Sequence, residues 1–222
     1  MQKGAKYSIN KKEIRLHGGT GMAKETIKLI DISKDLLASQ PAYEDTPPVV
    51  HIEAQSEQGG RRSVLLTSLH NGTHICAPAA WLEGAKTVDA YEPGRFVGEC
   101  RVVKAKGALT GSWIDNMGLY RCDKLLIKGE GKGKIDPSAA EALVDSGVKL
   151  VGTDADSIGI EPKNAEVRRI LAEADCLVLE GLDLEKAEMG TYFLIAQPLL
   201  MEGCEAAPCR ALLAEDYLYW NR

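Results

Sequence analysis

The sequence contains few aromatic residues and few histidines, and it has no long apolar run. Its 222 residues include two phenylalanines, three tryptophans and four histidines. None of its apolar runs approaches the roughly 20 residues that a membrane-spanning helix needs, so we expect no membrane partner. Its 27 lysines and arginines are mixed with 32 acidic residues and form no basic stripe interleaved with aromatics, which argues against a nucleic-acid partner.

The six cysteines never form a CxxC pair and lie far apart in the chain. Small secreted disulfide scaffolds look different, so we expect free thiols in a reducing compartment. Residues 1–26 are polar, rich in lysine and glycine, and without an apolar stretch of signal-peptide length. We therefore expect a cytoplasmic protein in which residues 1–26 form a partly flexible N-terminal extension.

The remaining composition is typical of a globular protein, with 45% hydrophobic and 27% charged residues and a net charge of −5. This length allows a large core in one domain, which we place at residues 27–222. Apolar alternation and short apolar runs predict strands at residues 28–32, 49–53, 62–69, 97–104, 124–128, 148–152, 176–180, 192–199 and 209–214. Three prolines predict an extended loop at residues 39–48.

Two helices are expected in the second half of the chain. Asp136 and Pro137 have the chemistry of a helix start, a capping carboxylate followed by proline, and Gly147 is suited to the end. A further helix opens at Pro162 and runs to about residue 174. Because this helix joins two predicted strands, it indicates a right-handed parallel crossover. The sequence thus predicts a mixed α/β fold that is rich in strands.

Metal-binding side chains are concentrated between His70 and Pro78. His70 and His74 are separated by three residues, and the thiol of Cys76 follows closely. Gly72 and Pro78 make a helix unfavourable here, but a turn could direct both imidazoles at one ion. Imidazole and thiolate are both good zinc ligands. The alternative is two ordinary polar histidines at a strand end, an alternative that the neighbouring thiol makes weaker.

Glu180 is the second candidate site residue. It follows Leu177, Val178 and Leu179 at the expected carboxyl end of a parallel strand. Open α/β sheets place their sites at such ends. A solvated strand end explains the same pattern equally well.

These segments together resemble the putative cyclase family, metal-dependent hydrolases that include bacterial kynurenine formamidases and isatin hydrolases. The family's HxGTHxDxPxH motif is similar to the stretch from His70 to Ala80. Further similarities lie at residues 31–33 with 41–43, at 152–158, at 179–182, at 196–199 and at 203–210. The resemblance extends from about Leu29 to Ala214. It implies a swivelling β/β/α fold with a mixed sheet, a homo-oligomer, and a site for two divalent metals, usually zinc or manganese.

The resemblance also implies roles for individual residues. His70 and His74 would bind the first metal, Glu180 would bridge both metals, and Tyr43 would contact a small substrate. Three other positions depart from the family pattern. Cys76 stands in place of a bridging aspartate, Arg168 in place of a histidine ligand, and Ala80 in place of the acid/base histidine.

These departures change the expected chemistry. Arginine has no lone pair to offer a metal and keeps its positive charge, so we expect no second metal beside Arg168. Arg168 would instead pair with Glu180 or hold an anionic ligand. One divalent metal, zinc or manganese, could be bound by His70, His74, Cys76 and Glu180. Four protein ligands would close the coordination shell, whereas three would leave room for water.

Two functions remain open at this point. The first is a divergent hydrolase of a small N-formyl, cyclic amide or lactone substrate, with Cys76 as a metal ligand or as a thiolate nucleophile. The second is an inactive family member that acts as a small-molecule-binding protein or partner subunit. Its support is that the bridging aspartate, the second-metal histidine and the acid/base histidine are all missing, but chemistry that uses Cys76 places the hydrolase slightly ahead. A buried cysteine is more often inert than nucleophilic.

Overall fold

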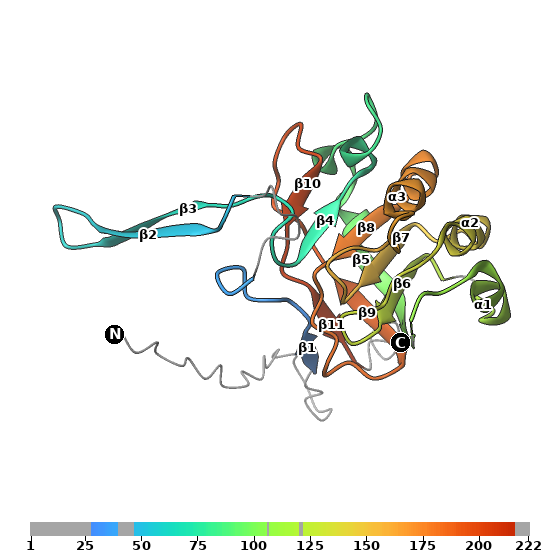
Figure 1. The fold of residues 1–222 in the computed structure, drawn as a ribbon. Coiled ribbons are helices and arrows are strands. Elements are labelled where there is room, and N and C mark those ends of the chain that lie inside the picture. Colours follow the sequence, from blue (N-terminus) through green and yellow to red (C-terminus); the bar gives the residue numbers. More distant parts are fainter. Residues whose placement is uncertain (1–27, 40–46, 106, 120–121, 216–222) are drawn as a thin grey trace.

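A curled sheet of nine strands organises the protein, and three helices lie along one side of it (Figure 1). The computed structural model describes residues 28–39, 47–105, 107–119 and 122–215. In spatial order the strands are β1 (Leu29–Asp31), β11 (Leu212–Ala214), β9 (Gly190–Ile195), β5 (Val97–Lys104), β6 (Lys124–Lys128), β7 (Leu150–Thr153), β8 (Leu177–Glu180), β4 (His74–Cys76) and β10 (Ala206–Pro208). Strands β5 to β8 are parallel to one another, and the remaining neighbours are antiparallel.

The helices are α1 (Gly111–Asn116), α2 (Pro137–Asp145) and α3 (Asn164–Glu173), with short 3₁₀ turns η1 (Pro78–Ala80), η2 (Val88–Ala90) and η3 (Pro93–Phe96). Helix α2 begins as predicted: the Asp136 carboxylate accepts the Ala139 N–H at 2.8 Å, and Pro137 is the first helical residue. Helix α3 joins β7 to the parallel strand β8, which confirms the expected parallel crossover. None of the described helices has the length and apolar character that a bilayer crossing demands.

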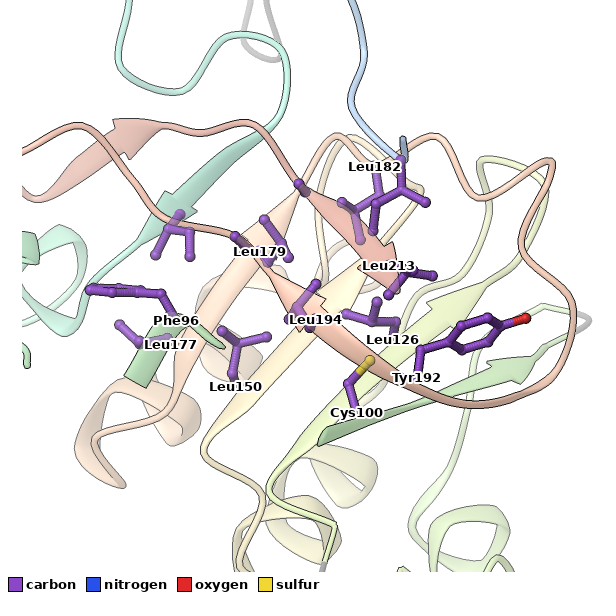
Figure 2. Packing of buried hydrophobic residues seen from close by; sticks show 14 of the residues in the cluster. Phe96, Cys100, Leu126, Leu150, Leu177, Leu179, Leu182, Tyr192, Leu194 and Leu213 are labelled. Carbon is purple, nitrogen blue, oxygen red and sulfur yellow. The ribbon is translucent and has the colours of Figure 1, made fainter. Parts of the chain in front are cut away.

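The central strands are buried on both faces, and their side chains alternate between two apolar cores. On β8, Leu177 and Leu179 face one core, and Val178 faces the other. Figure 2 shows the first core, where Leu126, Leu150 and Leu194 gather with these leucines. The second core lies between the sheet and the helices. Because both faces of the parallel strands are covered, the sequences of these strands are continuous apolar runs without alternation.

Several predicted boundaries were correct, and others were wrong. Strands β5 and β6 have the predicted bounds, but the strand expected at 62–69 ends at Leu66 as part of β3 (Arg61–Leu66). Strands β4 and β10 and helix α1 were not anticipated. Each of these two strands is only three residues long and is formed by pairing with distant strands, so neither leaves a periodic signal of its own. Residues 1–27 and 40–46 lie outside the described residues, so the N-terminal extension and the domain bounds remain predictions.

A close approach of two glycines fixes where β8 meets the start of β4. Gly181 has φ +66°, and a Cβ at this position would lie 2.1 Å from the carbonyl oxygen of Gly72. The hydroxyl of Thr73 donates to the Gly181 carbonyl at 2.6 Å. These contacts, with the antiparallel register that pairs His74 with Glu180, bring two distant segments of the chain together.

We predict that Gly181→Ala destabilises the protein by about 4 kcal/mol or more, because a β-carbon clashes with backbone that cannot move aside. Gly84→Ala is the matched control: Gly84 has φ +74° and no atom within 4 Å of the added carbon. It should cost only about 1–2 kcal/mol, the strain of the left-handed conformation. Urea unfolding followed by circular dichroism measures both, and equal losses would contradict the role assigned to this contact.

Candidate functional site

The two motif histidines and the cysteine converge at the start of β4. One ligand atom from each of His70, His74 and Cys76 lies within 4.8 Å of the others. His74 and Cys76 are two residues apart on a strand and therefore point to the same face. His70 reaches the same place from the preceding turn, and its Nδ1 lies 3.3 Å from the Cys76 sulfur. In other HxxxH motifs a helix brings the two imidazoles together. Here a turn followed by a short strand does so.

Hydrogen bonds on the far side of each imidazole fix which nitrogen faces the cluster. The Nδ1–H of His74 donates to the Gly72 carbonyl at 3.1 Å, and the Nε2–H of His70 donates to the Glu205 carboxylate at 3.2 Å. His74 Nε2 and His70 Nδ1 therefore face the side of the cluster where an ion would be bound, as in metal sites where outer groups orient the imidazoles. Among the described residues, the buried Nε2 of His74 has no hydrogen-bond partner.

Glu180 divides its two carboxylate oxygens between two environments. Its Oε1 accepts the Ile158 N–H at 2.7 Å and an Arg168 N–H at 2.6 Å. Its Oε2 lies 3.5 Å from His74 Nε2 and 3.9 Å from the Cys76 sulfur. One oxygen is thus held by fixed donors, and the other faces the cluster.

Arg168 is one of the most deeply buried charged residues in the described chain, with 1% of its surface exposed. It also donates to the Asn164 side-chain oxygen and the Ser157 hydroxyl, both at 3.2 Å. The ring of Trp81 covers the guanidinium, with 4.7 Å between the charge centre and the ring centroid. The geometry pairs Arg168 with Glu180, one of the two arrangements expected from the sequence.

These charges shift one another strongly. Burial raises the pKa of the Glu180 carboxyl, but His74 and Arg168 outweigh burial and bring that pKa down to about 2. Burial lowers the pKa of His74, yet the neighbouring Cys76 and Glu180 raise it to about 10. Burial likewise raises the pKa of the Cys76 thiol, and the two histidines lower it to about 7. Without an ion, a proton on His74 supplies positive charge that a bound cation would replace.

The donor set fits one divalent ion. Two oriented imidazoles, a thiolate and the nearby Glu180 oxygen match the preferences of zinc. Beyond Glu180, the guanidinium of Arg168 occupies the space beside Oε1 and carries a permanent positive charge. The residues there do not fit a second divalent ion, and the expectation of a single metal remains a prediction.

A cavity of about 500 Å³ opens beside the two histidines. Its other lining residues are mostly polar: Ser33, Lys34, Asp35, Ser39, Asp156 and Asp183, with Ala38, Gly72 and Gly181. Cys76, Glu180 and Arg168 do not line it and lie deeper in the protein. A small molecule in the cavity would therefore meet the imidazoles first.

Most of the predicted site residues come together, and some participants were missed. His70, His74, Cys76, Glu180 and Arg168 form one group that is buried except for the partly exposed His70, whereas Tyr43 lies outside the described residues. Ala80 packs against the second core, which lies between the sheet and the helices. Glu205 and Asn164 were missed. Glu205 gives no sequence signal, but Asn164 stands four residues before Arg168, a spacing that places two side chains on one helix face.

We predict that Arg168→Met destabilises the protein by about 3–5 kcal/mol, because it leaves the buried Glu180 carboxylate without its countercharge. Arg169→Met is the matched control in the next position of α3, where an exposed arginine pairs with Glu173. That change should stay within about 0.5 kcal/mol. Guanidinium unfolding measures both variants, and a loss below 1 kcal/mol for Arg168→Met would refute an energetically important pair.

Comparisons with known proteins identify the family of this chain. Residues 30–159 match the family model described as "Putative cyclase". A kynurenine formamidase from Sphingopyxis alaskensis is 32% identical over 206 residues, which cover 85% of this chain and 98% of the relative. A kynurenine formamidase from Bacillus cereus is 28% identical with the same coverage of both chains.

Solved structures share the fold. A potential metal-dependent hydrolase with cyclase activity superposes with a TM-score of 0.75 at 26% identity, covering 85% of this chain and 98% of that one. Isatin hydrolase A from Ralstonia solanacearum superposes with a TM-score of 0.73 at 18% identity, covering 85% of this chain and 92% of that one. This similarity supports the fold alone. The predicted mixed α/β fold is confirmed. With the family model spanning more than half of its length and a relative above 30% identity over most of it, the chain belongs to the putative cyclase family of metal-dependent hydrolases.

Proposed function

We propose that this protein is a single-metal hydrolase that opens the amide bond of a small N-formyl or cyclic amide substrate. The observation that carries the proposal is the buried Nε2 of His74, which is oriented toward Cys76 and Glu180 with no hydrogen-bond partner among the described residues. An unsatisfied buried polar atom requires an explanation, and a bound metal supplies one. The kynurenine formamidases related to this chain support the substrate class.

His70, His74 and Cys76 would hold the ion, and Glu180 Oε2 would lie beside it. The thiolate favours zinc over manganese, since manganese prefers oxygen ligands. Such an ion supplies Lewis acidity, which polarises a substrate carbonyl and acidifies water. If only the three cluster residues held the ion, water or substrate could also reach it, provided that the Glu180 carboxylate stays with Arg168.

The site lacks a histidine at position 80 to transfer protons. Ala80 cannot donate or accept a proton, and a positioned acid or base typically contributes about 10²–10⁴-fold in rate. The substrate amine must then take its proton from solvent or from a carboxylate of the cavity wall, such as Asp156. We therefore expect turnover that is slow by the standard of an enzyme with a complete proton relay.

A second candidate is hydrolysis with Cys76 as the nucleophile and no metal. The Cys76 sulfur lies 3.3 Å from His70 Nδ1, and His70 Nε2 lies 3.2 Å from Glu205. These contacts form a thiol, imidazole and carboxylate series, the arrangement that activates a cysteine nucleophile. Glu205 supplies the orienting group that was not visible in the sequence. Against this candidate, Cys76 is only 2% exposed and lies behind the histidines.

Metal content tests the proposed ligands directly. We expect about one zinc ion per chain by elemental mass spectrometry of untreated protein, and a large loss of that metal in His70→Ala, His74→Ala and Cys76→Ala. His51→Ala and Cys100→Ala are the matched controls, because they remove the same side-chain types on β2 (Val50–Gln55) and β5, away from the cluster. Full metal retention in the His74→Ala variant would show that the ion is not bound at this site.

Turnover separates the proposed functions. With zinc or manganese present, we expect slow hydrolysis of N-formylkynurenine or of one member of a cyclic amide panel, and loss of hydrolysis after chelation. Hydrolysis that survives chelation but disappears in Cys76→Ala would favour the thiol mechanism. Saturable binding of these compounds without any turnover would identify a non-catalytic binding protein and overturn both mechanisms.

A further inference from the structure

The wall of the cavity beside the two histidines carries an excess of negative charge. Its charged residues in the described chain are one lysine and three aspartates: Lys34, Asp35, Asp156 and Asp183. With both histidines neutral, one positive and three negative charges give this wall a net charge of −2. One ion pair, at 3.2 Å, joins Lys34 to Asp156. A molecule that enters the cavity must therefore match a surface of mainly negative charge.

The charges are arranged from the floor of the cavity to its mouth. His74 lies at the floor: 2% of its side chain is exposed, and its Nε2 has no hydrogen-bond partner in the described part of the chain. The Asp156 side chain is 78% exposed and therefore lies at the mouth. Asp35 and Asp183 are exposed as well. The floor thus carries a nitrogen that still lacks a partner, and the mouth carries the negative charge.

Each aspartate of the wall keeps one carboxylate oxygen available. The Oδ1 atoms of Asp35 and Asp183 each accept the backbone N–H of the residue two positions further along, at 3.0 and 3.2 Å. Asp156 uses its Oδ1 for Lys34. Within the residues that the structure describes, the three Oδ2 atoms have no hydrogen-bond partner. Because an ionised carboxylate accepts hydrogen bonds and cannot donate them, a ligand that meets these oxygens must be a donor.

The hydroxyl of Thr73 fixes the wall relative to the histidines. It accepts the backbone N–H of Lys34 at 2.8 Å and donates to the Gly181 carbonyl at 2.6 Å. Thr73 is 4% exposed and directly precedes His74. Three segments that line the cavity therefore meet at one buried hydroxyl. The backbone of the wall is held in place before a ligand arrives, which lowers the ordering cost of binding.

We infer that the cavity selects an amide substrate that carries a positive charge at the end opposite its amide group. The inference rests on the proposed function, which places the amide at the histidines. The amide carbonyl would then meet the floor, and an ammonium group further out would meet the Oδ2 atoms of Asp156 and Asp183. An ammonium group has three N–H donors and no acceptor, which suits a wall of carboxylates.

A negatively charged substrate finds no comparable place in the cavity. Lys34 is the one lysine or arginine of the described wall, and Asp156 already holds its ammonium group. A carboxylate on the substrate would have to displace Asp156 while it approaches Asp35 and Asp183. A cleft lined by one sign of charge concentrates ligands of the opposite sign. The expected order of affinity is therefore cation, then neutral molecule, then anion.

Binding of three matched amide analogues tests this order. The probes are 3-ureidobenzylammonium, phenylurea and 3-ureidobenzoate, which resist hydrolysis and differ mainly in charge. An NMR titration of the full chain as purified, followed through the ring signals of His70 and His74, gives the three dissociation constants. At low salt we expect the cation to bind at least about tenfold more tightly than the anion. In 1 M salt, which screens charges beyond about 3 Å, the difference should shrink to about twofold or less.

Three results of this titration would overturn the inference: equal affinities at low salt, the reverse order, or no binding of the cation. Substitutions in the wall then locate the effect. Asp156→Asn and Asp183→Asn should each weaken binding of the cation by about two- to fivefold, the size expected for one exposed charge. Lys34→Gln should strengthen it by a similar factor. Asp145→Asn is the matched control, because it removes the same charge from an exposed position of α2 outside the cavity. Wall variants that bind the cation no differently from this control would also contradict the inference.

Turnover keeps this inference distinguishable from the proposed function. N-formylkynurenine carries an ammonium and a carboxylate group, and N-formylkynuramine is the same molecule without the carboxylate. We expect kcat/KM to be about two- to fivefold higher for N-formylkynuramine, again the effect of one exposed charge. Equal values for the two compounds would refute the charge selection and leave the hydrolase intact. Hydrolysis of neither compound, with the cationic analogue still bound most tightly, would refute the hydrolase and retain a cavity that selects cations.

Discussion

The buried ion pair between Arg168 and Glu180 is the constraint on which the rest of the site depends. Both side chains are almost entirely withdrawn from solvent, and their charged atoms lie 2.6 Å apart. A buried charge is tolerated only when it is paired and hydrogen-bonded. Here the pairing uses Oε1 of Glu180, so only Oε2 remains to face His74 and Cys76. Helix α3, through Arg168, thus leaves only one Glu180 oxygen for any ion that the cluster would hold.

The charges explain why a thiol is compatible with this arrangement. A divalent ion brings two positive charges into a region where Arg168 already neutralises Glu180. The thiolate of Cys76 offsets one of them. The second offset would come from Glu205, whose carboxylate is hydrogen-bonded to the imidazole of His70. A neutral residue at either position would leave an uncompensated buried charge.

The sequence allowed prediction of the parts of the fold that local chemistry determines. Asp136 and Pro137 specify the start of α2 by capping, and the apolar run before Glu180 specifies β8 and its carboxyl end. Strand β4 could not be predicted in the same way, because three residues that include His74 become a strand only by pairing with β8 and β10. Glu205 was invisible for the same reason: its position beside His70 follows from the pairing of β10 with β4.

The site residues show the same division between local and distant causes. The convergence of His70, His74 and Cys76 was expected from their closeness in the sequence, in a turn, and the structure forms it from a turn that carries His70 and the short strand β4. The contact of Arg168 with Glu180 required a resemblance to place both residues near one centre, and the structure shows what they do there. A guanidinium in this position delivers a positive charge that does not dissociate, unlike a metal ion whose occupancy varies with its concentration. Arg168 and the Ile158 N–H therefore hold Glu180 in place without any contribution from an ion.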